Sequence, residues 1–404
     1  MRTIYVDKDI PRALVVKALR PVWRNVAFSA ISPSKFAEIP EPALPGSRWV
    51  RVRNRLCGIC ASDVSLLFVE ADPDVSPVAL PGYQRIYLGH ETVGEVVEIG
   101  SAVTRVKLGD RVVMDTRFQG ATCLSQEITP ICDHCAAQNF TRCENASAGI
   151  GPRGVGGGFS DSYTAHETEI YAVPESLSAD QAMMVEPLST GMHAALKRTP
   201  KKGQRALVVG SGIVGLSVLQ CVRAVAPECH LSAVARHPHQ AEAAKRLGAD
   251  EVIRGEDVYL ATERITGAKL YTGLFGNRTL LGGFDVVYDS IGSARTLQDS
   301  LRWTRAGGSV VMVGFELERQ KLDLNPIWHQ EIDLTGIYAH GGEDWHGGRT
   351  RTYDVVIEQL GRNALTVEGL VTHRFPLARW REAIETTLDK RTGAIKVAFD
   401  HGAG

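Results

Sequence analysis

Residues 207–215, LVVGSGIVG, constrain the fold of this chain more than any other stretch, because an apolar run there breaks into regularly spaced glycines. Leu207–Val209 is typical of a buried parallel strand. Residues 213–226 continue as an apolar segment of helical length, and Pro227 ends it. The sequence therefore predicts a strand, a glycine turn and a helix in direct succession.

The glycines of this turn have the spacing G-x-G-x-x-G, with Gly210, Gly212 and Gly215 at its three fixed positions. The first allows a tight turn, the second lets the backbone approach a pyrophosphate, and the third lets the helix pack on the strand. The helix N-terminus adds free N–H groups and positive dipole charge. The predicted contacts of a dinucleotide are Gly210, Ser211, Gly212, Ile213, Val214 and Gly215.

The composition restricts the class of protein. The chain has 404 residues, which suggests two domains, with 44% hydrophobic and 23% charged residues and a net charge of -1. This balance is typical of a soluble globular protein and argues against nucleic acid or an anionic membrane as the main partner. We find neither an apolar run of about 18 residues nor the apolar core of a signal peptide. We therefore expect a cytoplasmic protein whose eight cysteines are reduced and serve metal or catalytic roles before disulfides.

Two kinds of secondary-structure pattern divide the chain. After an expected edge strand and loop in residues 1–46, alternating strands with glycine turns begin at Trp49 and predict a small barrel-like β domain. After the glycine turn, strands and helices alternate, with a strand at 230–234, a helix at 240–247 and another near 296–304. This alternation predicts a doubly wound parallel sheet. Residues 266–281 show no clear pattern.

Two short motifs interrupt the β-rich part. Residues 58–63 read GICASD, and residues 89–91 read GHE. A thiolate, an imidazole and carboxylates are the ligands of a zinc site, and a catalytic zinc keeps one position open. Taken alone, Cys60 and His90 would be better read as ordinary core residues.

Together with the glycine turn, these motifs resemble those of the zinc-dependent medium-chain dehydrogenase/reductase family. The order GIC-x-SD, GHE, GDRV, the glycine turn and GGSVVMVG is much more specific than any single motif. The resemblance implies an α/β fold, in which a GroES-like, β-rich catalytic domain accompanies a Rossmann domain with a doubly wound parallel sheet. It places residues 1–187 and 339–404 in the catalytic domain and residues 188–338 in the NADP-binding domain. Lys396, in the returning tail, is expected at the surface, with a contact to the cofactor as the alternative.

The resemblance also implies the catalytic residues. Cys60 and His90 match zinc ligands, and Ser62 matches the hydroxyl that carries the substrate proton outward. Glu186 stands where alcohol dehydrogenases have a second cysteine and polyol dehydrogenases have EPLS, and Thr190 would contact the nicotinamide. Glu91 either enters the zinc shell or lies just behind it. Ser65 stands where some members carry a histidine, so the outer end of the proton path departs from the family.

A cysteine cluster, formed by Cys123, Cys132, Cys135 and Cys143, predicts a second, structural zinc site. The family pattern C-x2-C-x2-C-x7-C fits the last three, but Thr129 occupies the first position. Cys123, nine residues before Cys132, would complete four ligands through a longer loop. The alternative is a metal-free loop.

The end of the second Rossmann strand indicates the cofactor. The family usually has an acid there that binds the adenosine ribose, whereas this chain has Ala235 followed by Arg236. A missing acid and an adjacent cation favour the 2'-phosphate of NADP. Glu228 lies before the strand, at the wrong end.

The predicted function is zinc-dependent hydride transfer between NADP(H) and a secondary alcohol, polyol or sugar-like substrate, or the corresponding ketone. One alternative is an NADPH-dependent reductase of aldehydes, ketones or imines, and another is a non-catalytic NADPH-binding protein. The expected partner is a small-molecule substrate, and the expected assembly is a homodimer or homotetramer. Residues 66–87, with Phe68, Tyr83 and Tyr87, are candidates for the substrate mouth, with surface packing as the alternative.

Overall fold

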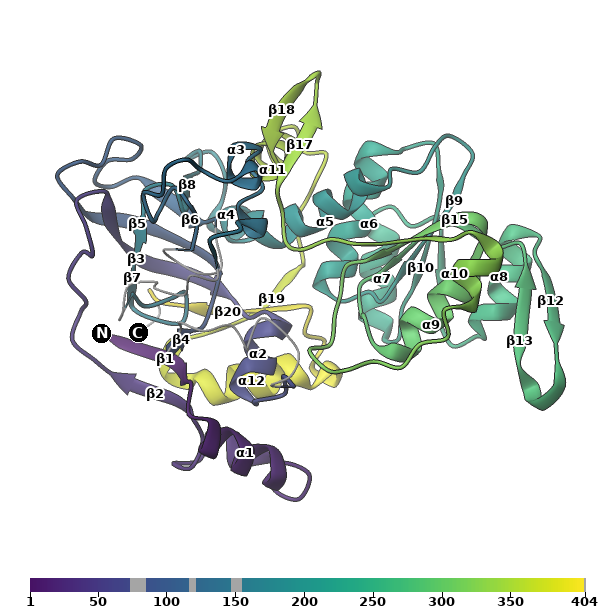
Figure 1. Ribbon diagram of the computed structural model, residues 1–404, viewed down its shortest axis with the longest axis horizontal. Helices are drawn as coiled ribbons and strands as arrows, with labels where there is room; N and C mark the ends of the chain where they lie inside the picture. The colour runs from purple at the N-terminus through teal and green to yellow at the C-terminus, as the bar shows by residue number, and fades with distance from the viewer. Residues whose placement is uncertain (73–84, 116–120, 147–154, 403–404) are drawn as a thin grey trace. The chain divides into compact units, whose positions relative to one another are not determined.

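The computed structural model describes residues 1–72, 85–115, 121–146 and 155–402 (Figure 1). The chain forms two compact units, Met1–Glu186 with Val371–Gly404, and Pro187–Leu370. Residues 339–370 thus belong to the second unit, whereas the sequence placed them in the catalytic domain. Their hydrogen bonds explain the difference, because Thr366 N donates to Gln220 Oε1 at 3.0 Å and Arg246 Nη2 to Glu368 O at 2.8 Å.

The first unit is built on a seven-stranded sheet with the order β19-β20-β3-β5-β6-β8, in which β7 also pairs with β3. The strands are β3 (Trp49–Gly58), β5 (Glu91–Ile99), β6 (Arg111–Met114), β7 (Ser162–His166), β8 (Ile170–Ala172), β19 (Val371–Phe375) and β20 (Lys396–Asp400). Alternate side chains of β3, among them Val50 and Val52, face a buried core with Val96 and Tyr163. Strand β3 pairs antiparallel with β5, β7 and β20, so the C-terminal tail joins the sheet beside the strand that leads to Cys60.

A smaller antiparallel sheet in this unit combines β1 (Arg2–Asp7), β2 (Ser34–Glu38) and β4 (Arg85–Tyr87). Between β1 and β2 the chain forms the helix α1 (Ile10–Leu19), where the sequence analysis expected only a loop. Asp9 caps this helix by accepting a hydrogen bond from Arg12 N, and Pro11 lies in its first turn. Both are helix-start signals that the sequence contains. Two further helices of this unit are α2 (Ala61–Leu67) and α12 (Trp380–Leu388).

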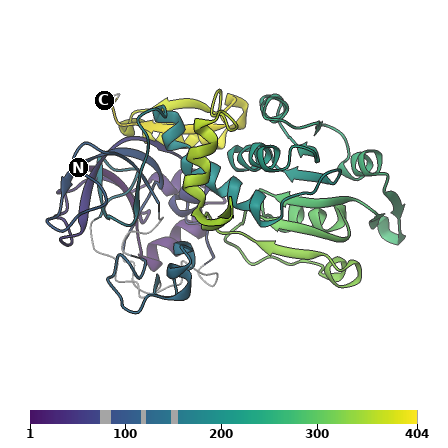
Figure 2. The same cartoon turned by 90° about the horizontal axis from the view of Figure 1, so that it is seen from above.

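The second unit, coloured from teal to yellow-green in Figure 2, contains a parallel sheet. This sheet has six strands in the order β11-β10-β9-β14-β15-β16. The strands are β9 (Arg205–Val209), β10 (His230–Val234), β11 (Glu251–Ile253), β14 (Phe284–Asp289), β15 (Thr304–Met312) and β16 (Asp333–Gly336). The chain leaves β9 toward β10 and β11, then returns to the other side of β9 at β14. This reversal is the switch point at which doubly wound sheets bind ligands, and the glycine turn follows β9 there.

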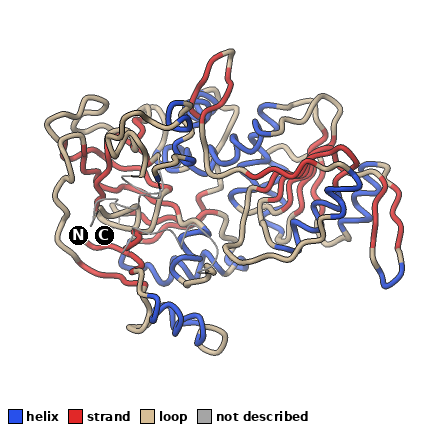
Figure 3. Tube along the Cα trace, in the orientation of Figure 1, coloured by secondary structure: helices blue, strands red, loops and turns tan. Residues whose placement is uncertain are grey.

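Helices connect these strands, as the sequence predicted (Figure 3). They are α6 (Ile213–Val225), α7 (Pro238–Arg246), α8 (Val258–Thr266), α9 (Ala294–Trp303) and α10 (Asn325–Gln330). The helix α5 (Val185–Lys197) precedes β9, and α11 (Thr352–Gly361) follows β16. The unassigned residues 266–281 form an antiparallel hairpin of β12 (Lys269–Thr272) and β13 (Arg278–Leu281). A second hairpin joins β17 (Gly342–Trp345) to β18 (Gly348–Arg351). None of the helices in the described ranges is both long and apolar enough to span a membrane.

Candidate metal centres and cofactor turn

Three predicted residues of the first unit come together as one group. The ligand atoms of Cys60, His90 and Glu91 all lie within 4.8 Å of one another. Cys60 is the N-cap of α2, just after β3, and Glu91 begins β5. The antiparallel pairing of these strands sets Gly58 opposite Glu91, which brings together two motifs that are about 30 residues apart in sequence.

A buried carboxylate, Asp63, holds this group in place. Its Oδ2 accepts a hydrogen bond from Cys60 N at 3.3 Å, and its Oδ1 accepts one from Gly89 N at 3.0 Å. The same Oδ1 lies 3.4 Å from His90 Nδ1. A carboxylate on Nδ1 orients an imidazole so that Nε2 faces a metal. Asp63 lies within the GICASD motif but was not among the residues predicted for this site.

Lys396 is not at the surface, as the sequence analysis expected, but is fully buried with its ammonium group against Glu91 Oε2. Its Nζ also donates to Ile59 O at 3.1 Å. Burial lowers the pKa of Lys396, but the charges of Glu91, Cys60 and Glu186 together raise it above its ordinary value. The expectation failed because β20 lies beside β3, a long-range pairing that the local sequence does not reveal.

The absence of a side chain at Gly58 makes room for this ion pair. A Cβ atom at Gly58 would lie 2.1 Å from Glu91 Oε2 and 3.2 Å from Lys396 Cδ. Both distances are shorter than ordinary van der Waals contact. The glycine of the GIC motif is therefore explained by the close approach of Glu91.

The other predicted catalytic residues, Glu186, Thr190 and Ser62, are not members of this three-residue group. Glu186, in the first turn of α5, is buried but is not a member of the three-residue group. Its charge nevertheless acts on Lys396. Thr190 lies farther along α5, in the second unit. Ser62 Oγ is buried and has no hydrogen-bond partner among the described residues.

The donor set fits a zinc ion. Cys60 offers a thiolate, His90 an imidazole and Glu91 a carboxylate, and zinc in proteins takes these ligands in tetrahedral arrangements. Catalytic zinc uses three protein ligands. The group therefore contains enough donors to hold zinc and leave one position open.

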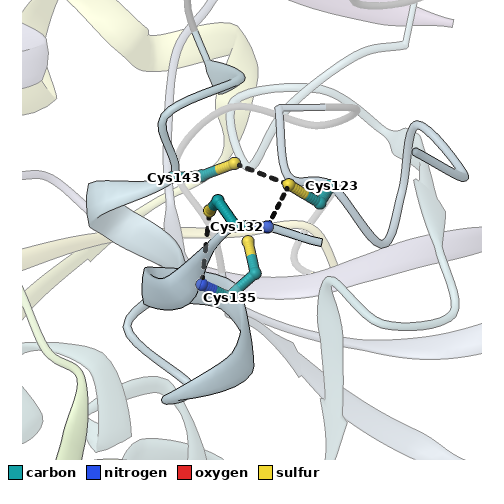
Figure 4. Close-up of side chains that lie close together, drawn as sticks. All are labelled: Cys123, Cys132, Cys135 and Cys143. Atoms are coloured by element: carbon teal, nitrogen blue, oxygen red, sulfur yellow. Dashed lines mark hydrogen bonds between the residues drawn. The ribbon is translucent and has the colours of Figure 1, made fainter. Parts of the chain in front are cut away.

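The four cysteines of the second predicted site also converge (Figure 4). Their sulfur atoms lie within 4.8 Å of one another, and Cys123 Sγ is 3.6 Å from Cys143 Sγ. Zinc–sulfur bonds of about 2.3 Å at tetrahedral angles would separate the sulfurs by about 3.8 Å. Cys123 thus joins the cluster despite its departure from the family spacing, and the four positions fit a structural zinc.

N–H groups around this cluster favour thiolates. Asn145 Nδ2 and Cys132 N donate to Cys123 Sγ at 3.1 and 3.4 Å. Cys132 is the N-cap of the short helix α3 (Asp133–Ala136) and accepts from Cys135 N. Burial raises the pKa of Cys132, but the hydrogen bonds outweigh it and lower the pKa to about 7. Burial raises the pKa of Cys135, so this thiol depends more on a metal for ionisation.

The glycine turn has the geometry that its spacing predicted. Gly210 has φ +91°, and a Cβ at Gly215 would lie 1.7 Å from Gly210 O, so neither position accepts a side chain without movement. Gly212 is the N-cap of α6, and Ser211 Oγ donates to Val234 O at 3.0 Å. This bond ties the turn to the end of β10, where Ala235 is buried and Arg236 is exposed.

The predicted substrate mouth is only partly described. Tyr83 lies outside the described residues. Phe68 is buried, and its ring centroid is 5.3 Å from that of Phe28 in an edge-to-face contact. Tyr87 is half-buried on β4, near Tyr5. Phe68 therefore packs in the hydrophobic core, whereas the alternative given for this segment was packing at the surface.

Comparison with known proteins identifies two family models in the chain. The alcohol dehydrogenase GroES-like domain matches residues 46–175, and the zinc-binding dehydrogenase domain matches residues 214–352. D-arabitol-phosphate dehydrogenase of Enterococcus avium is 28% identical over 344 residues, which cover 84% of this chain and 87% of that protein. L-idonate 5-dehydrogenase of Vitis vinifera is 29% identical over 362 residues, covering 87% of each. The fold resembles that of 2R,3R-butanediol dehydrogenase from Bacillus subtilis, with a TM-score of 0.68, 24% identity, and coverage of 91% of this chain and 96% of that one.

Proposed function

Because this chain belongs to the zinc-dependent medium-chain dehydrogenase family and is an oxidoreductase of alcohols or polyols, we propose that it transfers hydride between NADP(H) and a secondary alcohol, polyol or sugar-like substrate. The observation that carries this proposal is the group of Cys60, His90 and Glu91 around one point, with Ser62 Oγ unpaired nearby in sequence. A purely cofactor-binding protein would not need such a donor set.

Each candidate site residue of the first unit has a role in the proposed reaction. Cys60, His90 and one carboxylate hold the metal, and Asp63 keeps His90 in the tautomer that presents Nε2. Ser62 Oγ accepts the proton of the substrate hydroxyl and passes it outward. Zinc bound here would supply a Lewis acid that lowers the pKa of that hydroxyl, and the nicotinamide would take the hydride.

The assignment of the ligating carboxylate follows from charge. A Cys60 thiolate and one carboxylate balance the two positive charges of zinc, whereas Lys396 already neutralises Glu91. Glu186 carries the second charge in this proposal, and Glu91 lies behind the metal, held by Lys396. A neutral centre suits a buried site, because unbalanced charge is costly there.

NADP is the proposed cofactor because of the residues after β10. Ala235 offers no acceptor for a ribose hydroxyl, and the exposed Arg236 is available to a 2'-phosphate. Thr190 is assigned to the nicotinamide side, and residues 210–215 to the pyrophosphate. The cytoplasmic location and the assembly as a homodimer or homotetramer belong to the same proposal.

A substrate screen tests this function. The purified protein is mixed with NADP or NAD and a panel of secondary alcohols, pentitols, hexitols and their phosphates, and the near-ultraviolet absorbance of the reduced nicotinamide is followed. We expect saturable reduction of NADP with at least one polyol or secondary alcohol. We expect the Ser62→Ala variant to reduce NADP much more slowly than the unmodified protein. Positioned proton-transfer groups contribute about 10²- to 10⁴-fold, which sets the size of that loss.

A further inference from the structure

A polar pocket of about 460 Å³ lies on the first unit, apart from both metal-ligand groups. Its wall includes three arginines at alternate positions of β3, Arg51, Arg53 and Arg55, together with Glu98, Asp161 and His401. Alternate residues of a strand point to the same face, so the side chains of Arg51 and Arg53 lie on one side of the strand.

Arg51 is the buried member of the three, with 9% of its surface exposed. Its Nε donates to Glu98 Oε2 at 2.7 Å, and its Nη2 donates to Pro42 O at 2.6 Å. These bonds fix the plane of the guanidinium group. The third nitrogen, Nη1, is buried and has no hydrogen-bond partner in the described part of the chain. A buried donor of this kind is costly unless something accepts its hydrogens.

The carboxylates near the pocket already have partners. Glu98 pairs with Arg51, Asp161 pairs with Arg2 at 2.9 Å, and Arg55 is matched by Glu95. Glu41, also in the wall, accepts a hydrogen bond from Ser162 Oγ at 3.1 Å.

Two donors therefore remain for a ligand. The backbone of Arg53 pairs with β5 and β7, but its side chain is exposed and forms no ion pair or hydrogen bond with the residues that the structure describes. Arg51 and Arg53 thus both line the same pocket, and each keeps N–H groups without a partner in the described part of the chain. His401 adds no donor, because its Nε2 donates to Gly158 O at 3.0 Å and burial lowers the pKa of the ring, which leaves Nδ1 as an acceptor.

We propose that this pocket binds a small oxyanion, the phosphate or carboxylate group of a metabolite, through Arg51 and Arg53. A guanidinium group matches two oxygens of such an anion with parallel N–H bonds, and a fixed guanidinium loses little freedom on binding. This site is separate from the proposed NADP phosphate at Arg236, which lies in the second unit. The proposal does not depend on the proposed function.

Calorimetric titration of the zinc-loaded, NADP-saturated protein with inorganic phosphate and, separately, with acetate tests the proposal at constant ionic strength. Saturating NADP keeps the added anion from the cofactor site. We expect one saturable site for at least one of the two anions, and the tighter of the two identifies the natural group as a phosphate or a carboxylate. Because Arg53 is exposed, Arg53→Gln should fold normally and weaken binding about tenfold or more. Arg53→Lys, which keeps the charge but loses the fork, should weaken it less.

Arg24→Gln is the matched control, since it removes the same charge from an exposed arginine outside the pocket. It should leave the affinity unchanged. The proposal is overturned if neither anion gives a saturable signal, if Arg53→Gln binds as tightly as the unmodified protein, or if Arg24→Gln loses as much affinity as Arg53→Gln. Loss of the signal in Arg236→Gln, with Arg53→Gln unaffected, would assign the anion to the cofactor site and would also overturn it.

Discussion

The ammonium group of Lys396 and the carboxylate of Glu91 form an ion pair from which water is almost excluded, with 0% and 2% of the two side chains exposed. The two residues are about 300 positions apart, and the sheet brings them together because β20 and β5 both pair with β3. Glu91 belongs to the candidate metal group. The C-terminal tail is therefore part of the metal centre's surroundings.

Replacing Lys396 with methionine should destabilise the first unit, because it leaves the Glu91 charge buried and unpaired. Breaking one side of a buried ion pair costs about 3 to 5 kcal/mol. Urea unfolding of the zinc-loaded protein, followed by tryptophan fluorescence, measures the change in the free energy of unfolding. The double variant Lys396→Met with Glu91→Gln should recover part of the loss, since it removes the unpaired charge. Equal loss in the single and double variants would show that the packing of the lysine stem, and not the ion pair, is responsible.

The two candidate carboxylates should differ in their effect on zinc. Lys396 neutralises Glu91, so we expect Glu186→Gln to weaken zinc binding by more than tenfold relative to Glu91→Gln. Competition with a chromophoric chelator measures the affinity of the catalytic site, with the four-cysteine site as an internal reference. A larger loss in Glu91→Gln would place Glu91 on the metal and Glu186 behind it.

Glu167 should make the stability of the first unit depend on pH. Burial raises its pKa, but hydrogen bonds from Thr104 N and Arg105 N, at 2.7 and 2.9 Å, and the charge of Arg48 bring it below the ordinary value. A lowered folded-state pKa means that the stabilisation is complete above the unfolded pKa of about 4.3. It is lost as the pH falls through the folded-state pKa.

Glu167→Gln should therefore reduce the free energy of unfolding by about 2 kcal/mol at neutral pH, the usual value of hydrogen bonds to a charged group. The difference between the two proteins should shrink below about pH 4. Parallel denaturant titrations at several pH values give this difference directly, and protonation of groups common to both proteins cancels. A difference that does not change with pH would contradict the assignment.

The preference for NADP should depend on Arg236. Charge-assisted bonds to the 2'-phosphate are worth about 1.5 to 3 kcal/mol, which corresponds to a roughly ten- to hundredfold preference over NAD. Fluorescence titration with both cofactors measures the preference, and Ala235→Asp combined with Arg236→Gln should reverse it. Tighter binding of NAD by the unmodified protein would show that Arg236 does not bind the phosphate.

The parts of the fold that depend on local sequence were predictable. The predicted strand 230–234 matches β10, and the expected helix near 296–304 is α9, because strand propensity, glycine turns and helix caps act over a few residues. The pairing of GIC with GHE followed from family order, not from periodicity. Lys396, by contrast, was misplaced because its burial depends on which strands become neighbours.

Other features were missed because their signals are short or compete with stronger ones. The helix α1 begins at Ile10, with Asp9 as its N-cap and Pro11 in its first turn. The prolines and short apolar runs around it nevertheless favoured a loop. The strands β12 and β13 have four residues each, which is too short for their alternation to stand out in the sequence. Leu270 and Leu280 pack on the core, while Tyr271 and Leu281 are exposed. Asp63 is part of a recognisable motif, but its contact with His90 is a tertiary one between residues 27 positions apart, which the motif does not reveal.

The most direct measurement of the central claim is the turnover of Cys60→Ala, compared with that of Cys132→Ser, after the zinc content of each protein has been determined. Cys60→Ala should lose the catalytic zinc, keep the structural one, bind NADP normally and show no measurable alcohol oxidation. Cys132→Ser should lose the structural zinc and unfold more easily, because structural zinc contributes folding free energy. It should still turn over while folded. Unchanged turnover in Cys60→Ala, with loss of the catalytic zinc confirmed, would contradict the metal-dependent mechanism.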